Sequence, residues 1–323
     1  KRPWSLRRKL LIGGLAAVII LGLALGLGLG LTIGRSGGDD DGGDDNGPAP
    51  TSSPLPTPNT TLAWRPSVND TWQIILLNPM LLDSDATSVT PNVSIFDIDL
   101  FTTTPDTIDT LHRLGKKVIC YFSAGSFEPG RPDSNQFQES DMGKELDGWP
   151  GERWLKLGSE NVKKIMKGRV ELAGQKGCDG VDPDNVDGYQ NENGLSLTAQ
   201  DSISFMSYLS SLTVPLNLTL GLKNAGDIIP QVLPIVHFSV NEQCVQESEC
   251  DTFHAFVDAG KPVFHIEYPD GAGKKLSEGT RQKYCDNKGD ATGSGGFSTV
   301  LKNMDLDGWV EYCDGSVETT AVN

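Results

Sequence analysis

Short apolar runs alternate with helix-like segments along most of this chain of 323 residues. The runs end near turn signals, whereas the stretches between them show the 3.6-residue period of amphipathic helices. Strands that alternate with helices favour a parallel α/β sheet, and eight runs within residues 62–323 match the number and size of a (β/α)8 TIM-type barrel. The predicted strands are residues 73–77, 94–99, 117–122, 180–184, 218–222, 235–240, 262–266 and 308–311. A doubly wound open sheet is the alternative fold.

Two of the intervening segments have a clear helical face. In the first, apolar residues three or four positions apart are Val162, Ile165, Met166, Val170 and Ala173. In the second, they are Ile203, Met206, Leu209 and Leu212. Thr198 with Asp201 three residues later predicts a capping box at the start of the second helix.

Residues 10–34 contain no charged side chain and consist largely of Leu, Ile, Val, Ala and Gly. A helix of that length crosses a hydrocarbon core of about 30 Å. Basic residues precede this stretch and acidic residues follow it, so the positive-inside rule predicts a cytoplasmic tail at 1–9 and a single-pass type II anchor at 10–34. Residues 35–61 read as a flexible, acidic and Pro-rich stalk, which places the domain at 62–323 outside the cell membrane. A long signal peptide cleaved near Ser36 is the alternative.

The cysteines and glycosylation motifs agree with an extracellular domain. Six cysteines allow fifteen pairings, of which we favour Cys120–Cys178, Cys244–Cys250 and Cys285–Cys313. A zinc site is disfavoured because no CxxC pair occurs and the four histidines are scattered. Asn-x-Ser/Thr motifs stand at Asn59, Asn69, Asn92 and Asn217.

The charge distribution restricts the class of partner. The formal net charge is −16, and the first 35 residues carry six basic side chains and no acid, so the remainder is more acidic than the net figure indicates. A nucleic-acid partner is excluded on charge, because phosphate binding needs a basic surface. A cationic or neutral partner fits better. We expect a monomer.

Polar residues follow most of the predicted strands, at the end where a parallel barrel carries its chemistry. Asp97 and Asp99 in the second predicted strand are two positions apart and therefore share a face. Burying such a pair of like charges costs free energy unless a cation lies nearby. An aromatic residue in the third run can contact a sugar, although a core role is commoner. The candidate binding residues at these strand ends are Asp97, Asp99, Tyr121, Lys223, Asn224 and Glu267.

The most acidic segment follows the fourth predicted strand. It contains Asp182, Asp184 and Asp187, broken by Pro183 and followed by Gly188. We predict that Asp182, Asp187 and the neighbouring Asn185 bind substrate. Such a segment is a carboxylate-rich loop. An EF-hand is excluded because its closing Glu is missing, but a looser Ca²⁺ site remains an alternative.

Paired carboxylates, without a Ser-His-Asp order, a Gly-rich phosphate loop or a zinc motif, indicate glycoside hydrolysis. That reaction needs one ionised carboxylate and one protonated carboxyl group. We assign Asp184 as nucleophile and Glu242 as acid/base, and we expect burial beside Phe238 and Val240 to raise the pKa of Glu242. A retaining outcome is expected if the two groups lie close, and no cofactor or metal is needed. The alternatives are a non-catalytic carbohydrate-binding or wall-anchoring barrel and a metal-dependent hydrolase built on the Asp loop.

Seven ordered segments carry a resemblance to a known family: residues 97–101, 118–125, 149–154, 180–189, 222–225, 241–244 and 260–268. Together they resemble glycoside hydrolase family 114, in particular its membrane-anchored fungal endo-α-1,4-polygalactosaminidases. The resemblance implies a (β/α)8 barrel that cleaves α-1,4-linked galactosamine polymers such as deacetylated galactosaminogalactan.

Carried over by position, the resemblance implies that Asp184 and Glu242 are the catalytic carboxylates and that the candidate residues above line the cleft. Many members read Glu-Pro-Asp-Asn where this chain has Asp182-Pro183-Asp184-Asn185. That difference of one methylene group leaves Asp184 in place. The segment after Tyr268 is not covered by the resemblance.

Overall fold

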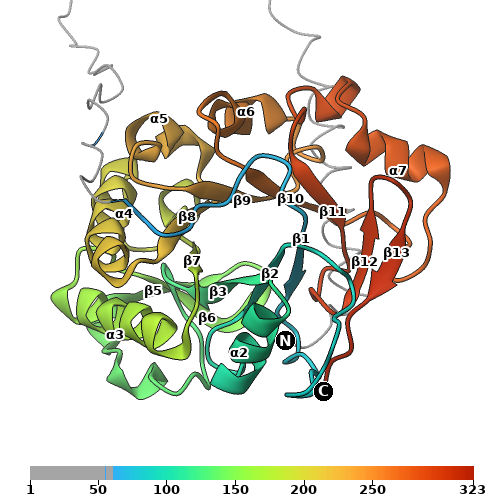
Figure 1. Cartoon of the computed structure of the whole chain (residues 1–323). Helices are drawn as coiled ribbons and strands as arrows, with labels where there is room; N and C mark the ends of the chain where they lie inside the picture. The colour runs from blue at the N-terminus through green and yellow to red at the C-terminus, as the bar shows by residue number, and fades with distance from the viewer. Residues whose placement is uncertain (1–54, 56–60) are drawn as a thin grey trace, which may run out of the picture. The chain divides into compact units, whose positions relative to one another are not determined.

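Eight parallel strands form the centre of the structure, a computed structural model that describes Leu55 and residues 61–323 (Figure 1). They pair side by side in chain order. The parallel strands are β1 (Trp72–Ile75), β2 (Ile95–Asp99), β3 (Lys117–Ser123), β7 (Gly180–Asp184), β8 (Thr219–Lys223), β9 (Phe238–Glu242), β10 (Val263–Glu267) and β11 (Ser298–Leu301). Two antiparallel strands, β12 (Trp309–Tyr312) and β13 (Val317–Thr319), extend the sheet beyond β11.

Helices surround the strands on the outside of the curled sheet (Figure 1). The α-helices are α2 (Pro105–Arg113), α3 (Glu160–Lys176), α4 (Ala199–Thr213), α5 (Ile229–Val232), α6 (Cys250–Asp258) and α7 (Glu278–Cys285). The short 3-10 helices are η1 (Ser134–Gln136), η2 (Glu139–Asp141), η3 (Gly188–Gln190), η4 (Val214–Leu216), η5 (Gly226–Ile228) and η6 (Gly289–Ala291). Strands alternating with outer helices make this a TIM-like α/β barrel.

A small antiparallel sheet interrupts the strand and helix alternation between β3 and α3. It consists of β4 (Ser126–Phe127), β5 (Met142–Leu146) and β6 (Trp149–Leu155), in the order β4-β6-β5. Since only two residues separate the end of β3 at Ser123 from the start of β4, this sheet starts at the carboxyl end of the barrel strands, where the loops of a parallel barrel carry function.

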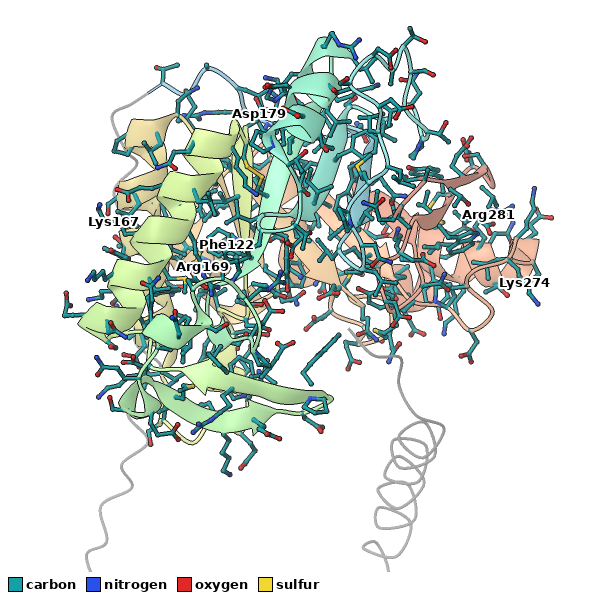
Figure 2. The ribbon with its side chains drawn as sticks, turned by 90° about the horizontal axis from the view of Figure 1, so that it is seen from below. Phe122, Lys167, Arg169, Asp179, Lys274 and Arg281 are labelled. Carbon is teal, nitrogen blue, oxygen red and sulfur yellow. A yellow bond between two sulfur atoms is a disulfide. The ribbon has the colours of Figure 1, made fainter. Side chains whose placement is uncertain are left out.

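The two-residue period of the strands separates an inner core from an outer one. Along β3, Ile119 belongs to the inner core and its neighbours Val118 and Cys120 belong to the outer core. The inner core consists of Trp72, Ile74, Ile95, Ile119, Phe238, Val240, Phe264, Ile266, Val300, Leu306 and Val310. The outer core packs against the helices, as Phe122 and Arg169 do between β3 and α3 in Figure 2. This alternation decides which polar side chains face the interior of the barrel.

Local sequence signals mark the ends of two of the helices. Ser159 caps α3, and Gly177 ends it with a φ of 89° that suits glycine. Thr198 and Asp201 form the predicted capping box at the start of α4. All five residues of the predicted α3 face are buried, as are Ile203, Met206 and Leu209 of the α4 face.

The last predicted strand is wrong in its role. Of the predicted residues 308–311, the last three lie in β12, which runs antiparallel, and the eighth parallel strand is β11, which the sequence did not reveal. Its polar sequence Ser298-Thr299 conceals it, because only Val300 and Leu301 are apolar. The order of the described strands runs from β1 to β13, without a β1–β11 ladder. Side chains join this seam instead: the Trp72 indole donates to Ser298 O at 2.7 Å and the Ser298 hydroxyl to Asp70 O at 2.7 Å.

The three disulfides have the predicted pairing. Cys120–Cys178, Cys244–Cys250 and Cys285–Cys313 have sequence separations of 58, 6 and 28 residues. Structural disulfides persist in oxidising compartments, so this domain is suited to an extracytoplasmic environment. The predicted membrane anchor at 10–34, the basic tail and most of the stalk lie outside the described residues. Among the residues that are described, the helices are all too short or too polar to cross a bilayer.

Candidate active site

The carboxyl ends of β2, β3, β7, β8 and β9 bring the predicted site residues to one end of the barrel. Parallel strands end on the same side, and the inner-core pattern continues upward from apolar to polar residues. In β9, Phe238 and Val240 face the interior, so Glu242 does as well. The same alternation turns Asp97, Tyr121, Asp182, Asp184 and Lys223 inward.

Lys223 joins the two predicted catalytic carboxylates. Its Nζ lies 3.3 Å from Asp184 Oδ1 and 3.2 Å from Glu242 Oε2. These two oxygen atoms therefore lie no more than about 6.5 Å apart, at the lower edge of the roughly 6.5–9.5 Å range typical of inverting enzymes. Burial alone would lower the pKa of Lys223, but the charges of Asp184 and Glu242 outweigh it and raise that pKa well above its ordinary value. Lys223 therefore stays an ammonium ion, although its side chain is 2% exposed.

Each carboxylate also accepts a hydrogen bond from a tyrosine, the buried Tyr121 or the half-buried Tyr268. The Tyr121 hydroxyl donates to Asp184 Oδ2 at 2.7 Å, and the Tyr268 hydroxyl donates to Glu242 Oε1. Burial, followed by the charge of the neighbouring carboxylate, raises the pKa of both phenols, which therefore remain donors. Sequence reasoning missed Tyr268. The alternation of β10 contained the signal, because Phe264 and Ile266 face inward and Tyr268 comes next in that series.

Glu242 does not lie in the apolar environment that its sequence neighbours suggested. Its side chain is 25% exposed and lies between Lys223 and Tyr268. The apolar neighbours Phe238 and Val240 belong to the inner core, toward the other end of the same strand. Two polar partners, one of them charged, replace the predicted apolar burial.

The loop after β7 is held by close backbone contacts that fix Asp184. The backbone amides of Ala124 and Gly125 donate to Asp184 O at 2.8 and 2.9 Å. A Cβ atom on Gly125 would lie 1.7 Å from Asn185 O, so only glycine fits there. Asn185 has a φ of 62°, and its side-chain amide donates to the Ser126 hydroxyl at 2.8 Å. The predicted binding residue Asn185 thus braces the loop beside Asp184.

Asn224 plays a comparable part beside Glu242. Its Oδ1 accepts the backbone amide of Glu242 at 2.8 Å, and its own backbone amide donates to Val240 O at 2.9 Å. Since these bonds tie the end of β8 to the end of β9, Asn224 places Glu242 next to Lys223.

Two further acids, Asp97 and Asp182, are buried without a hydrogen-bond partner. Both are 0% exposed, and neither oxygen atom of either carboxyl group has a partner among the described residues. Burial raises the pKa of Asp182 to about 7, since the attraction of Lys223 only partly opposes it. Burial and the charge of Asp182 raise the pKa of Asp97 well above its ordinary value. An acid pair of this kind can accept a cationic group.

Asp187 is a third acid with a perturbed carboxyl group. It is half-buried at the start of η3. Burial and the charge of Asp184 raise the pKa of Asp187 to about 6. This residue therefore belongs electrostatically to the group around Lys223.

Two predicted cleft residues have other roles in the structure. The Asp99 carboxylate forms an ion pair with Arg131 at 2.6 Å and accepts the backbone amides of Phe101 and Thr102, so it shapes the loop after β2. Glu267 lies on the outer face of β10, between the inward residues Ile266 and Tyr268. The prediction that Glu267 lines the cleft is therefore corrected, because the two-residue period turns it away.

One cluster among the described residues has ligand atoms close enough to surround a metal ion: Cys244, Cys250 and His265, within 4.8 Å of one another. Both sulfur atoms belong to a disulfide, so thiolate ligands are not available in this state. The Asp loop around Asp184 is instead arranged about Lys223.

The predicted glycosylation positions are on the surface where the structure describes them. Asn69, Asn92 and Asn217 are exposed, and Asn59 lies outside the described residues. Exposure is the condition that a glycan acceptor has to meet.

Comparison with known proteins agrees with this geometry. A family model described as glycoside-hydrolase family GH114 matches residues 53–318. The crystal structure of Aspergillus fumigatus Ega3 in complex with galactosamine is 52% identical, covers 79% of this chain and 99% of its own, and has a TM-score of 0.72. The glycoside hydrolase domain of PelA from Pseudomonas aeruginosa is 14% identical, covers 78% and 99%, and has a TM-score of 0.55, which is a likeness of fold alone. No curated protein sequence matches the chain.

The buried acid pair predicts a pH dependence of stability. Asp182 titrates near pH 7 in the folded chain but near its ordinary pKa of 3.8 in the unfolded chain. The folded state therefore holds more protons between these values, and the free energy of unfolding should fall as pH rises from about 4 to 7. Asp182→Asn should remove much of this fall and raise the free energy of unfolding at pH 8 by roughly 2–4 kcal/mol.

Urea unfolding of both proteins at pH 5 and pH 8 measures this effect. An exposed replacement, Glu192→Gln, serves as the control, because the Glu192 carboxylate pairs with Lys144 at the surface. An unchanged pH dependence in Asp182→Asn would contradict the assignment of Asp182 as a buried acid without a partner.

Proposed function

Because this chain belongs to glycoside hydrolase family 114, we propose that it is an endo-acting hydrolase of α-1,4-linked galactosamine polymers. The observation that carries the proposal is the pair of carboxylates, Asp184 and Glu242, on a single buried lysine at the strand ends. The similarity to Ega3, whose structure holds galactosamine, supports the choice of substrate. Deacetylated galactosaminogalactan is a polymer of this class.

We propose a retaining double displacement, because the upper bound of about 6.5 Å between the two carboxylate oxygens admits the roughly 5–5.5 Å typical of retaining enzymes. In the first step, Asp184 bonds to the anomeric carbon while the glycosidic bond breaks, and the Glu242 carboxyl group gives its proton to the leaving oxygen. In the second step, Glu242 takes a proton from water, the water oxygen bonds to the anomeric carbon, and the bond to Asp184 breaks. Tyr121 and Lys223 orient the attacking carboxylate, and Tyr268 orients the acid.

The acidic surroundings support a substrate that carries ammonium groups. Galactosamine without its acetyl group is a cation, and the chain has a net charge of −16. Asp97 and Asp182 are buried carboxyl groups that lack hydrogen-bond partners, and Asp187 lies nearby in the same electrostatic group. An ammonium group of the polymer would add positive charge to that of Lys223, which only partly offsets these acids.

We further propose that the domain is displayed outside the cell on a type II anchor. The uncharged residues 10–34 and the basic residues before them support this topology. The three disulfides and the exposed Asn69, Asn92 and Asn217 fit passage through a secretory compartment.

Removal of either carboxylate tests the mechanism. Asp184→Asn and Glu242→Gln should each lower kcat by at least about 10³-fold, since one deletes the nucleophile and the other the proton donor. A reducing-end assay on deacetylated polymer measures the loss, and the thermal unfolding midpoint checks folding. Glu192→Gln is the surface control. Activity near that of the unmodified protein in either variant would contradict the assigned pair, and loss of activity in chelator would favour the metal-dependent alternative.

The stereochemistry of the product tests the retaining assignment. A double displacement on an α-linked polymer releases the α anomer first, which then mutarotates to the equilibrium mixture. Proton NMR during the first minutes of reaction distinguishes the two anomers. Early appearance of the β anomer would show that water attacks directly and that Asp184 acts as a base.

The charge of the substrate tests the recognition step. Hydrolysis should fall at least about 10-fold when the amines of the polymer are fully acetylated, and it should also fall as ionic strength rises. Asp182→Asn should lower the ratio of the hydrolysis rate on deacetylated polymer to the rate on acetylated polymer, because it removes one carboxyl partner of the substrate's ammonium groups. Equal rates on both polymers by the unmodified enzyme would refute a cationic substrate.

A further inference from the structure

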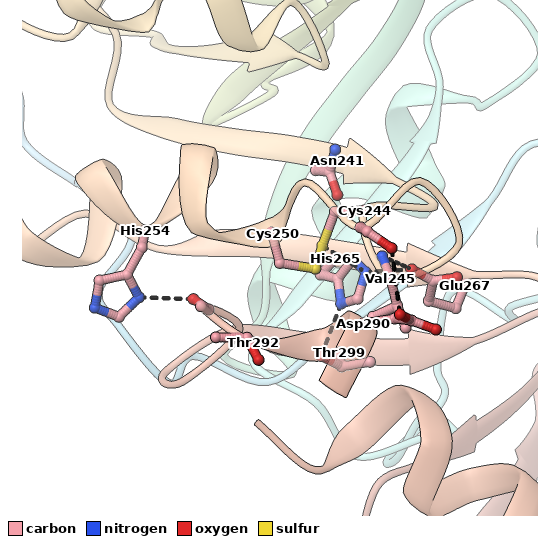
Figure 3. The surroundings of a disulfide bond; sticks show 12 residues. Asn241, Cys244, Val245, Cys250, His254, His265, Glu267, Asp290, Thr292 and Thr299 are labelled. Carbon is pink, nitrogen blue, oxygen red and sulfur yellow. Dashed lines mark hydrogen bonds and ion pairs between the residues drawn. A yellow bond between two sulfur atoms is a disulfide. The ribbon is translucent and has the colours of Figure 1, made fainter. Parts of the chain in front are cut away.

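A buried polar cluster lies behind Glu242, on the outer face of β10. His265 and Glu267 are both 0% exposed, and the Cys244–Cys250 disulfide lies against the histidine ring (Figure 3). Burying a carboxylate costs free energy unless hydrogen bonds or ion pairs compensate it. The reaction proposed above does not use Glu267. The contacts of the cluster show what depends on it.

Glu267 caps the segment that follows the predicted acid. Its Oε1 accepts the backbone amide of Val245 at 2.7 Å and lies 2.9 Å from His265 Nε2. Oε1 already serves as the acceptor for Val245, so we assign Nε2 of His265 as a second donor to the same oxygen. The other ring nitrogen, Nδ1, lies 2.9 Å from the Thr299 hydroxyl, and Cys244 Sγ lies 3.3 Å from Nε2. Figure 3 shows this chain of contacts running from β11 to the loop after β9.

The segment held by these contacts is residues 242–245, which begin with Glu242 itself. Gln243 has a φ of 65°, and its backbone amide donates to Ile266 O at 2.8 Å. The Glu242 amide donates to Asn224 Oδ1, and the Val245 amide to Glu267. Three of the four backbone amides of residues 242–245 thus have a fixed acceptor, and the disulfide anchors the remaining residue, Cys244.

Strand β10 therefore holds Glu242 from both of its faces. On the inner face, Tyr268 donates to the Glu242 carboxylate. On the outer face, Glu267 fixes the backbone three residues beyond Glu242. Glu267 is the last residue of β10 and Tyr268 follows it directly, so a movement of the end of this strand or loss of either contact would shift the acid.

We propose that Glu267, oriented by His265 and Thr299, is a positioning residue for Glu242. The inference rests on the proposed function, because it assigns Glu267 a part in that same reaction. A misplacement of about 1 Å at a reacting group can cost roughly 10²-fold in rate. The rate of the chemical step should therefore depend on Glu267, whereas substrate binding, which uses the inner face, should not.

The test compares two replacements of Glu267 with a matched control. Glu267→Ala should lower kcat about 10²-fold with KM changed by less than about 3-fold. Glu267→Gln should restore kcat to within about 5-fold of the unmodified enzyme, because its amide oxygen still accepts from Val245. Glu311→Ala is the control: Glu311 is equally buried and accepts the Leu276 amide at 2.7 Å, but it lies on β12. It should lose stability with kcat unchanged.

A milder variant covers the case in which Glu267→Ala does not fold. Thr299→Val keeps the shape of the side chain and removes only the partner of His265 Nδ1. It should lower kcat by about 3–10-fold at unchanged KM. The proposal is overturned if Glu267→Ala or Thr299→Val leaves kcat at the unmodified value, if Glu311→Ala lowers kcat as much as Glu267→Ala, or if Glu267→Gln gives no rescue.

Hydrogen exchange separates this inference from the proposed function. The Val245 amide should exchange faster in Glu267→Ala than in the unmodified protein or in Glu311→Ala, whether or not the polymer is hydrolysed. If the unmodified protein has no hydrolase activity, the proposed function fails, and the exchange of Val245 still decides whether Glu267 holds the segment. Unchanged exchange in Glu267→Ala would overturn the positioning role.

Discussion

The buried ammonium group of Lys223 is the interaction on which the site depends. Two carboxylates lie within 3.3 Å of it, and its charge also acts on Asp97, Asp182 and Asp187. Several acids crowded at one end of a barrel would repel one another or take up protons without such a cation. Lys223 allows Asp184 and Glu242 to lie within reach of the same sugar ring, which is the geometric condition for a double displacement.

The alternation of side chains along the strands distributes the chemistry of this protein between two faces. Inward residues pass from an apolar layer, such as Phe264 and Ile266, to Tyr268 at the mouth, while the outward His265 and Glu267 brace the neighbouring loop. The end of β10 thus holds Glu242 in two ways: Tyr268 contacts its carboxylate, and Glu267 holds the backbone that follows it. Rigid strands hold such groups more accurately than loops do, because the strand backbone is fixed on both sides by hydrogen bonds.

The acid pair Asp97 and Asp182 illustrates a conflict between stability and recognition. A packed apolar pair at these positions would give a more stable barrel, since neither carboxyl group has a hydrogen-bond partner in the folded protein. Their retention is understandable if a cationic ligand completes them. Functional sites commonly hold groups that the fold alone would not select.

The sequence favoured one disulfide pairing among fifteen, and the structure decided it. By itself the sequence determined the class of fold, seven of the eight parallel strands and the position of Asp184 and Glu242 at strand ends. These features follow from local patterns: apolar runs, helical periods, caps and the order of segments along the chain. The tertiary structure alone decided that Lys223 joins the two carboxylates, that Tyr268 contacts Glu242, that Asp99 pairs with Arg131, and that β11 follows β10 in the sheet. Contacts of this kind depend on register and on the face that each strand turns inward. Glu267 and Tyr268 are adjacent in the sequence, so they lie on opposite faces. Only the packing of β10 against its neighbours decides that Tyr268 lies at the mouth of the barrel and Glu267 on its outer face.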